Sequence, residues 1–170
     1  MNRAAIALGS NLGDRAANLA AALSRLAALD AATILRVSPS IETAPVVPPG
    51  AEDAAGGSYL NAVALIGTEL APRALLNELL RIEHELGRVR RPHNRWGERS
   101  IDLDLLLFDE LVIDEPGLVV PHPRLHLRRF VLHPLAHVAP AWVVPTLGKS
   151  VAELFAALPP PPQVTANNPP

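Results

Sequence analysis

Two aspartates separated by one residue form the first pattern in this sequence that could carry chemistry. Asp102 and Asp104 lie within the mostly apolar run 101–108, which predicts a β-strand. Side chains alternate along a strand, so both carboxylates face one side of it. Two adjacent carboxylates repel each other unless a cation neutralises them, and Mg²⁺ prefers carboxylates together with water and phosphate oxygens. The pair indicates a magnesium site, although a solvated edge strand would show the same pattern. The alternate side chains are expected to face the core: Ile101, Leu103, Leu105 and Leu107.

An arginine-rich segment directly precedes these aspartates. Residues 88–99 contain five arginines and a single acid, Glu98. Guanidinium groups bind phosphate oxygens through paired hydrogen bonds. Trp96, one of two tryptophans in the chain, could stack on a purine or pterin ring or could anchor the segment. Taken alone, the segment could also be a solvated basic surface. The arginines are Arg88, Arg90, Arg91, Arg95 and Arg99.

The adjacency of the arginines and the aspartates indicates more than either pattern does alone. A site for metal-bridged phosphates needs anionic metal ligands and cationic groups close together. Because the two segments are neighbours in sequence, they supply both kinds of group without any long-range contact. The sequence therefore predicts an enzyme that acts on the phosphates of a nucleotide with the help of magnesium.

The composition limits the other functional classes. The chain has 170 residues, 49% of them hydrophobic and 19% charged, and a net charge of −2, which is typical of a globular domain. This charge gives no general attraction to nucleic acid or to an anionic membrane. The absence of cysteine excludes disulfides and fits a reducing compartment. We therefore expect a cytoplasmic protein with no membrane segment.

Two further motifs resemble ligand-binding patterns, but we expect each to lack a feature that the binding site would need. Gly148-Lys149-Ser150 could end a phosphate-binding P-loop, but that loop needs a glycine at the position of Val143. His133 and His137 have the spacing of zinc ligands on a helix. We expect Pro134 to interrupt that helix, which argues against a zinc site.

The elements that must position the aspartates follow a β-α-β-β-α-β order. The periodicity predicts strands over 4–8, 33–37, 59–68 and 101–108, and helices over 15–29 and from Pro72 to Gly87. Asp14 is the expected N-cap of the first helix. This order resembles the ferredoxin-like arrangement, an α+β fold with a mainly antiparallel sheet and helices packed on it.

The rest of the chain connects or borders this core. Residues 44–58 are rich in proline and glycine and predict a long functional loop. Peripheral C-terminal helices are expected over 130–138 and from the capping box at Ser150 to about Leu158. We expect a single domain over residues 1–158 and a disordered proline-rich tail over 159–170.

Taken together, these segments resemble the 6-hydroxymethyl-7,8-dihydropterin pyrophosphokinase family of folate biosynthesis. The resemblance is colinear over about residues 4–158. Its most specific part is the string Arg95-Trp96-Gly97, Arg99 and Ile101-Asp102-Leu103-Asp104, with Val120-Pro121-His122 following. The other matching segments are 6–14, 42–45, 59–63, Gly87-Arg88 and 130–132.

The resemblance implies a reaction and a set of site residues. The reaction is transfer of pyrophosphate from ATP to the pterin's hydroxymethyl group, releasing AMP. Two Mg²⁺ ions would be bound by Asp102 and Asp104, and Arg88 and Arg99 would be catalytic. The implied nucleotide-binding residues are Glu83, Arg90, Arg95, Trp96, Leu105, His122 and Arg128. The implied pterin-binding residues are Thr43, Val46, Tyr59, Asn61, Trp96 and Phe130.

The sequence departs from the family pattern in places, and two other functional classes are open as alternatives. Glu98 stands where the family commonly has proline, and segment 47–58 lacks the usual glycine and D-Q-P pattern. One rival is a noncatalytic ferredoxin-like module that binds RNA or a nucleotide through residues 88–99. The other is an inactive nucleotide binder. We expect a monomeric enzyme whose partners are ATP and the hydroxymethyldihydropterin, with no nucleic acid and no membrane.

Overall fold

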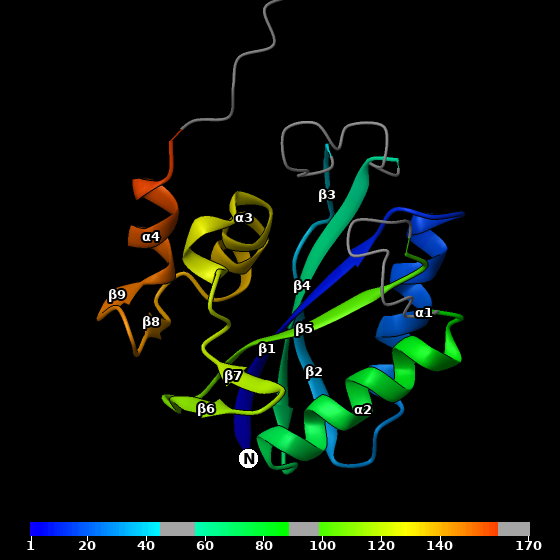
Figure 1. Ribbon diagram of the computed structural model, residues 1–170, viewed down its shortest axis with the longest axis horizontal. Coiled ribbons are helices and arrows are strands. Elements are labelled where there is room, and N and C mark those ends of the chain that lie inside the picture. The colour runs from blue at the N-terminus through cyan, green and yellow to red at the C-terminus, as the bar shows by residue number, and fades with distance from the viewer. Residues whose placement is uncertain (45–56, 89–98, 160–170) are drawn as a thin grey trace, which may run out of the picture.

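The protein is built around one five-stranded antiparallel sheet with helices on both faces (Figure 1). The computed structural model describes residues 1–44, 57–88 and 99–159. The strands of the sheet are β1 (Asn2–Ser10), β2 (Ala32–Val37), β3 (Ile41–Thr43), β4 (Tyr59–Thr68) and β5 (Asp102–Phe108). Their order is β2-β4-β1-β5, with the short β3 also paired to β4. Every pairing between neighbours is antiparallel.

The connections between these strands confirm the predicted ferredoxin-like arrangement. Helix α1 (Arg15–Ala27) follows β1, and helix α2 (Pro72–Glu85) joins β4 to β5. Each helix thereby connects two strands that have a third strand between them. β3 is an addition to the predicted strands, and it matters because it brings Thr43 beside Tyr59.

The sheet separates two hydrophobic cores. One lies between the sheet and helices α1 and α2, and contains Ile6, Ile66 and Leu103. The other lies under helices α3 (Arg129–Val138) and α4 (Val151–Ala157), and contains Val63, Leu106 and Leu135. The C-terminal helices therefore cover the second face of the sheet, which is the face that carries Asp102 and Asp104.

A bulge in β5 changes which face its later residues occupy. In the pairing with β1, Leu105 lies opposite Ile6 and Leu107 opposite Ala5, so Leu106 is an extra residue. Leu106 and Leu107 both pack in the core under α3. The expectation that Leu107 shares a face with Leu103 and Leu105 is therefore wrong, because simple alternation ends at the bulge.

Helix α3 confirms the helix expected over 130–138 and contradicts the expectation that Pro134 interrupts it. The helix runs continuously from Arg129 to Val138 with Pro134 inside it, and the ring centroids of His133 and His137 lie 5.0 Å apart. A proline inside a helix costs one hydrogen bond and about 3 kcal/mol. Pro134 is itself buried on the face that packs against the sheet, so tertiary packing offsets this cost.

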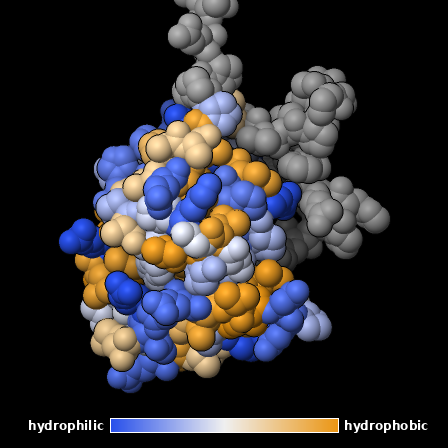
Figure 2. All heavy atoms as spheres, turned by 90° about the vertical axis from the view of Figure 1, so that its left-hand side faces the viewer, coloured by the Kyte–Doolittle hydropathy of each residue, from blue (hydrophilic) through white to orange (hydrophobic). Residues whose placement is uncertain are grey.

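Smaller elements border the two cores. They are β6 (Ile113–Glu115), β7 (Leu118–Val120), a 3₁₀ turn (Leu125–Leu127), β8 (Val143–Val144) and β9 (Lys149–Ser150). β6 and β7 pack against the first core, and the 3₁₀ turn and β8 pack against the second. Figure 2 shows the side of the molecule that carries the C-terminal elements, where hydrophobic and hydrophilic side chains are interspersed. Val143 and Leu147 of the β8–β9 hairpin are among the exposed ones. Within residues 1–44, 57–88 and 99–159, no helix has the length and apolarity needed to cross a bilayer.

The helix caps follow the sequence closely. Asp14 accepts a hydrogen bond from the Ala17 N–H at 2.9 Å, and Ser150 with Glu153 forms the predicted capping box. The domain limits 1–158 and the disordered tail stay predictions, because residues 160–170 lie outside the described ranges.

The cap of α1 gives a first testable prediction. Replacing Asp14 by alanine leaves the Ala17 N–H without its acceptor and should lower the free energy of unfolding by about 1 kcal/mol. Urea denaturation measures this change. Asp30→Ala, at an exposed position after the same helix, is the matched control and should have a smaller effect. Equal losses in the two variants would contradict the capping role.

Candidate active site

The candidate site lies on the sheet face that carries Asp102 and Asp104. In the strand register, Asp102 of β5 lies opposite Gly9 of β1, and Gly9 lies opposite Asn61 of β4. A Cβ atom added to Gly9 would lie only 3.3 Å from the Asn61 Oδ1. Because glycine has no side chain, the Asn61 amide can lie close to the backbone of β1 beside Asp102.

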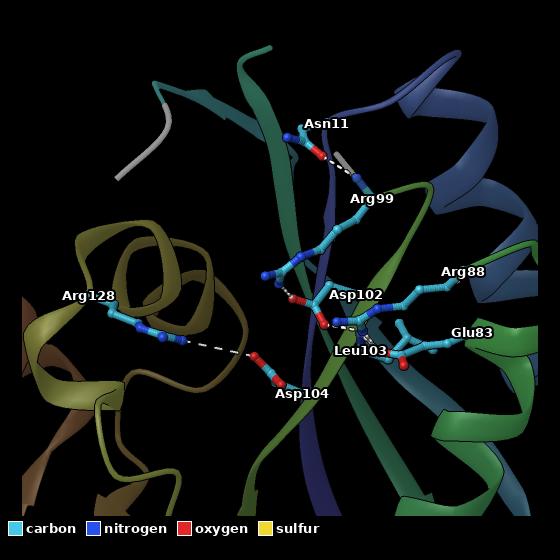
Figure 3. Close-up of polar contacts among 8 residues, drawn as sticks. All are labelled: Asn11, Glu83, Arg88, Arg99, Asp102, Leu103, Asp104 and Arg128. Atoms are coloured by element: carbon cyan, nitrogen blue, oxygen red, sulfur yellow. Dashed lines mark hydrogen bonds and ion pairs between the residues drawn. The ribbon is translucent and has the colours of Figure 1, made fainter. Parts of the chain in front are cut away.

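Two arginines hold the Asp102 carboxylate (Figure 3). The Arg88 guanidinium donates to its Oδ1, and the Arg99 Nη1 lies 2.5 Å from its Oδ2. Burial by itself would raise the pKa of Asp102, but the charges of Arg88 and Arg99 outweigh burial and hold this pKa below its ordinary value. Asp102 is therefore a stable carboxylate that is neutralised from two sides.

Asp104 has a different environment. Its side chain is 42% exposed, and the Arg128 Nη1 lies 3.9 Å from its Oδ2. Partial removal from water and the charge of Asp102 raise the pKa of Asp104. A cation placed between the two carboxylates would remove this repulsion. Figure 3 shows Arg128 reaching across from α3 toward Asp104, so the second carboxylate lies between β5 and α3.

The donor set fits magnesium. The described residues contain no group of three or more histidine, aspartate or glutamate side chains placed to hold an ion. The two aspartates would therefore bind a cation only together with water or substrate oxygens. Mg²⁺ is usually bound in this way, by one or two carboxylates plus the phosphates of a substrate.

Glu83 connects α2 to this cluster of charges. Its carboxylate is buried, and its Oε1 accepts hydrogen bonds from the Leu103 N–H at 2.7 Å and from the Arg88 guanidinium. The family resemblance implies that Glu83 contacts the nucleotide. In the structure its carboxylate contacts the arginine and the strand that form the site. A nucleotide contact stays a prediction.

Asn11 fixes the backbone of Arg99, a role that the sequence analysis missed. The Asn11 N–H donates to the Arg99 carbonyl at 3.2 Å, and the Arg99 N–H donates to the Asn11 Oδ1 at 2.7 Å. Asn11 is only 5% exposed. The sequence does show a polar residue directly after a predicted strand. It does not reveal the partner of Asn11, because Arg99 lies 88 residues away in the chain.

The predicted pterin-binding residues of β3 and β4 lie together on the same face. The Asn61 Nδ2 donates to the Thr43 Oγ1 at 2.8 Å, and Thr43 is opposite Tyr59 in the strand pairing. Phe130 of α3 packs at the border of the core beneath that helix, with the Arg128 guanidinium 5.6 Å from its ring centroid. The structure thus brings an amide, a hydroxyl and aromatic rings to one side of Asp102.

A second group missed by the sequence analysis holds the ends of β3 and β4. The Arg15 Nη1 donates to the Glu42 Oε1 at 2.8 Å and to the Ser58 Oγ at 2.7 Å. The Ser58 hydroxyl in turn donates to Glu42. These bonds connect the start of α1 to the residues next to Thr43 and Tyr59. No local spacing reveals them, because the three residues come from separate segments.

The predicted nucleotide-binding residues occupy several positions around the carboxylates. The His122 N–H donates to the Leu106 carbonyl at 2.9 Å, which places His122 beside β5. The side chain of Leu105 is buried in the core under α1 and α2, so any contact with a ligand on the aspartate side would be made by its backbone. An open hollow near the end of α2 is lined, among the described residues, by Leu80, Glu83, His84 and Arg88.

Four predicted site residues cannot be placed. Val46, Arg90, Arg95 and Trp96 lie in residues 45–56 and 89–98, outside the described ranges, as does Glu98. Their roles stay predictions.

The fold and the site define an α+β protein with paired carboxylates suited to hold a cation and arginines suited to bind phosphates. Comparison with known proteins identifies the family. The chain belongs to the 7,8-dihydro-6-hydroxymethylpterin-pyrophosphokinase (HPPK) family, whose model matches residues 5–140.

Two relatives and one solved structure illustrate the similarity. The 2-amino-4-hydroxy-6-hydroxymethyldihydropteridine pyrophosphokinase of Pseudomonas aeruginosa is 42% identical over 159 residues, covering 94% of this chain and 93% of the relative. The protein of the same name from Bacillus subtilis is 47% identical, over 81% of this chain and 78% of the relative. The structure of wild-type Plasmodium falciparum HPPK-DHPS with pteroate matches with a TM-score of 0.71 at 14% identity. That match covers 91% of this chain but only 44% of the other, and it supports the fold alone.

His122 gives a prediction on pH dependence. Burial, together with the charges of Arg128 and Arg124, lowers the pKa of His122 from 6.5 to about 4. Between these two values the unfolded chain binds a proton that the folded protein does not. The folded state should therefore lose stability as the pH falls through this window. Urea unfolding from pH 7 to pH 4 should show a smaller decrease for His122→Gln than for the wild type, and parallel curves would contradict the prediction.

Proposed function

We infer that the protein transfers the β,γ-pyrophosphoryl group of ATP to the hydroxymethyl oxygen of 6-hydroxymethyl-7,8-dihydropterin, a step of folate biosynthesis. The products are the pterin diphosphate and AMP. Membership of the HPPK family supports the reaction. The observation that carries it in the structure is the pair Asp102 and Asp104 beside Arg88 and Arg99 on one sheet face.

We propose that Asp102 and Asp104 hold two Mg²⁺ ions together with the triphosphate. The raised pKa of Asp104 and the mutual repulsion of the two carboxylates support this assignment, because a bound cation relieves both. When bound, magnesium neutralises phosphate charge during the transfer. The number of ions is part of the proposal.

The two arginines would exchange one anion for another. In the structure Arg88 and Arg99 are paired with Asp102. When Asp102 binds a cation, their guanidinium groups become available to the phosphates that are transferred. Such preorganised cations stabilise charge where it develops in the transition state, and this is the main contribution that a protein makes to phosphoryl transfer.

We propose that the pterin binds beside Asn61 and Thr43, between Tyr59 and Phe130. The edge of a pterin alternates hydrogen-bond donors and acceptors, and an amide side chain presents both. The aromatic side chains suit the faces of the ring. Gly9 lies between Asn61 and Asp102 in the strand register, so a pterin beside Asn61 would have its hydroxymethyl group near Asp102.

We propose that the nucleotide binds on the other side of the carboxylates. Arg128 and His122 flank Asp104 and β5, and the hollow at Leu80, Glu83 and Arg88 lies at the end of α2. Burial and nearby arginines keep His122 neutral at neutral pH; its Nδ1 accepts from the Arg124 N–H at 3.2 Å, so its Nε2 can donate a hydrogen bond to a nucleotide oxygen or ring nitrogen. The monomeric state and the cytoplasmic location stay predictions.

The proposed reaction is tested by product formation. The purified protein, incubated with ATP, Mg²⁺ and 6-hydroxymethyl-7,8-dihydropterin, should release AMP only when the pterin and the metal are both present. Asp104→Ala should lower kcat by about a hundredfold or more, since it removes charge stabilisation in the transition state. A folded, ATP-binding protein that makes no AMP would contradict the reaction. RNA binding that survives in Asp104→Ala would instead support the noncatalytic alternative.

The pterin site gives a separate prediction. Thr43→Val keeps the shape of the side chain but removes the acceptor of the Asn61 amide, so this amide is no longer oriented. The KM for the pterin should rise about five- to tenfold, the effect of one lost hydrogen bond, while the KM for ATP should stay unchanged. Thr33→Val in β2, at an exposed position opposite Gly67 near the other end of β4, is the control. Equal changes in both KM values would contradict this placement of the pterin.

A further inference from the structure

We propose that Glu83 is a positioning residue, whose buried carboxylate holds Arg88 and allows Asp102 to bind a cation. This inference deepens the proposed function, because it rests on Asp102 being a metal ligand. This positioning role is different from the nucleotide contact that the family resemblance implies for Glu83. Three observations carry it: the way in which α2 ends, the contacts of the Glu83 carboxylate, and the position of Arg88 between two acids.

The end of α2 returns the chain to Glu83. The Arg88 N–H donates to the Glu83 carbonyl at 3.0 Å, and the Gly87 N–H donates to the His84 carbonyl at 3.1 Å. Gly87 has a φ of +80°, which glycine adopts without strain. This pair of bonds is a Schellman motif. It places Arg88 over the helix turn that carries Glu83, so that the backbone of Glu83 fixes where the arginine begins.

The side chain of Glu83 joins the same arginine to β5. Glu83 is 1% exposed, and its Oε1 accepts hydrogen bonds from the Leu103 N–H and from the Arg88 guanidinium. β5 is an edge strand with β1 as its neighbour, so the N–H groups on its outer edge need partners from elsewhere. Leu103 lies between Asp102 and Asp104. One buried carboxylate therefore fixes both the strand that carries the two aspartates and the arginine that faces them.

Arg88 lies between two carboxylates that would compete for it. Its Nη1 contacts both the Glu83 Oε1 and the Asp102 Oδ1, and its side chain is only 11% exposed. When Asp102 turns toward a cation, Glu83 still neutralises the buried arginine. Without the charge of Glu83, Arg88 would have to pair with Asp102, because an unpaired buried charge is strongly unfavourable. Arg88 would then compete with the cation for Asp102.

Replacing Glu83 by glutamine separates its hydrogen bond to the Leu103 N–H from its charge, which balances Arg88. The amide oxygen of Gln can still accept the Leu103 N–H, but the negative charge that balances Arg88 is lost. The affinity for a divalent cation should fall about tenfold, a typical coupling between contacting groups. The double variant Glu83→Gln/Arg88→Met removes the competing arginine as well. Its cation affinity should return to within about twofold of the wild type, although catalysis stays low because Arg88 is absent.

The experiment measures Mn²⁺ binding by water-proton relaxation, in the presence of α,β-methylene-ATP, which the enzyme cannot cleave. Wild type, Glu83→Gln and the double variant are compared with Glu78→Gln, an acid on the same helix that pairs with Arg81. Hydrogen exchange at the Leu103 amide is followed in the ligand-free proteins. The proposal predicts weaker Mn²⁺ binding in Glu83→Gln only, with unchanged Leu103 protection.

Other outcomes would overturn the proposal. Unchanged Mn²⁺ affinity in Glu83→Gln would show that Glu83 has no such role. Weak binding that the double variant does not restore would indicate a merely structural role, as would a lost Leu103 protection. Weaker binding of the analogue without metal would indicate a direct nucleotide contact. If the wild type forms no AMP, the proposed function fails, but the Mn²⁺ measurements still decide the role of Glu83.

Discussion

The interaction on which this structure depends is the neutralisation of carboxylates on the face of a sheet. Asp102 and Asp104 lie one residue apart on β5, and burial makes their charges costly. Arg88 and Arg99 balance Asp102, and Arg128 approaches Asp104. These ion pairs offset part of the cost of the buried charges. In the proposed function, a metal-bound triphosphate would supply both the cations that the aspartates need and the anions that the arginines need.

The fold satisfies this constraint by bringing distant segments to one face. The antiparallel order β2-β4-β1-β5 places Gly9 between Asn61 and Asp102, so the predicted pterin and phosphate positions adjoin without side chains between them. The helices on the two faces differ in what they do. α2 and the turn after it supply Glu83 and Arg88 at the start of β5, whereas Arg128 just before α3 and Phe130 within it lie on the aspartate side (Figures 1 and 3). Both groups of helices are needed to surround the site.

Much of the fold follows from local signals in the sequence. The strand Tyr59–Thr68 and the cap at Asp14 are as predicted, because a continuous apolar run and a side-chain acceptor are signals contained within a few residues. The pair Asp102 and Asp104 was identifiable for the same reason. The bulge at Leu106 and the proline inside α3 were mispredicted, because packing between elements outweighs local preference there. The roles of Asn11 and of the Arg15, Glu42 and Ser58 group could not be predicted, since their partners are remote in sequence.

The central claim is that the carboxylates and arginines form one site that binds a nucleotide only together with a cation. The most direct test is calorimetric titration of the protein with α,β-methylene-ATP, with and without Mg²⁺. The account predicts tight binding that requires magnesium and that is lost in Asp102→Asn. Equal affinity with and without the metal, or in wild type and Asp102→Asn, would contradict it.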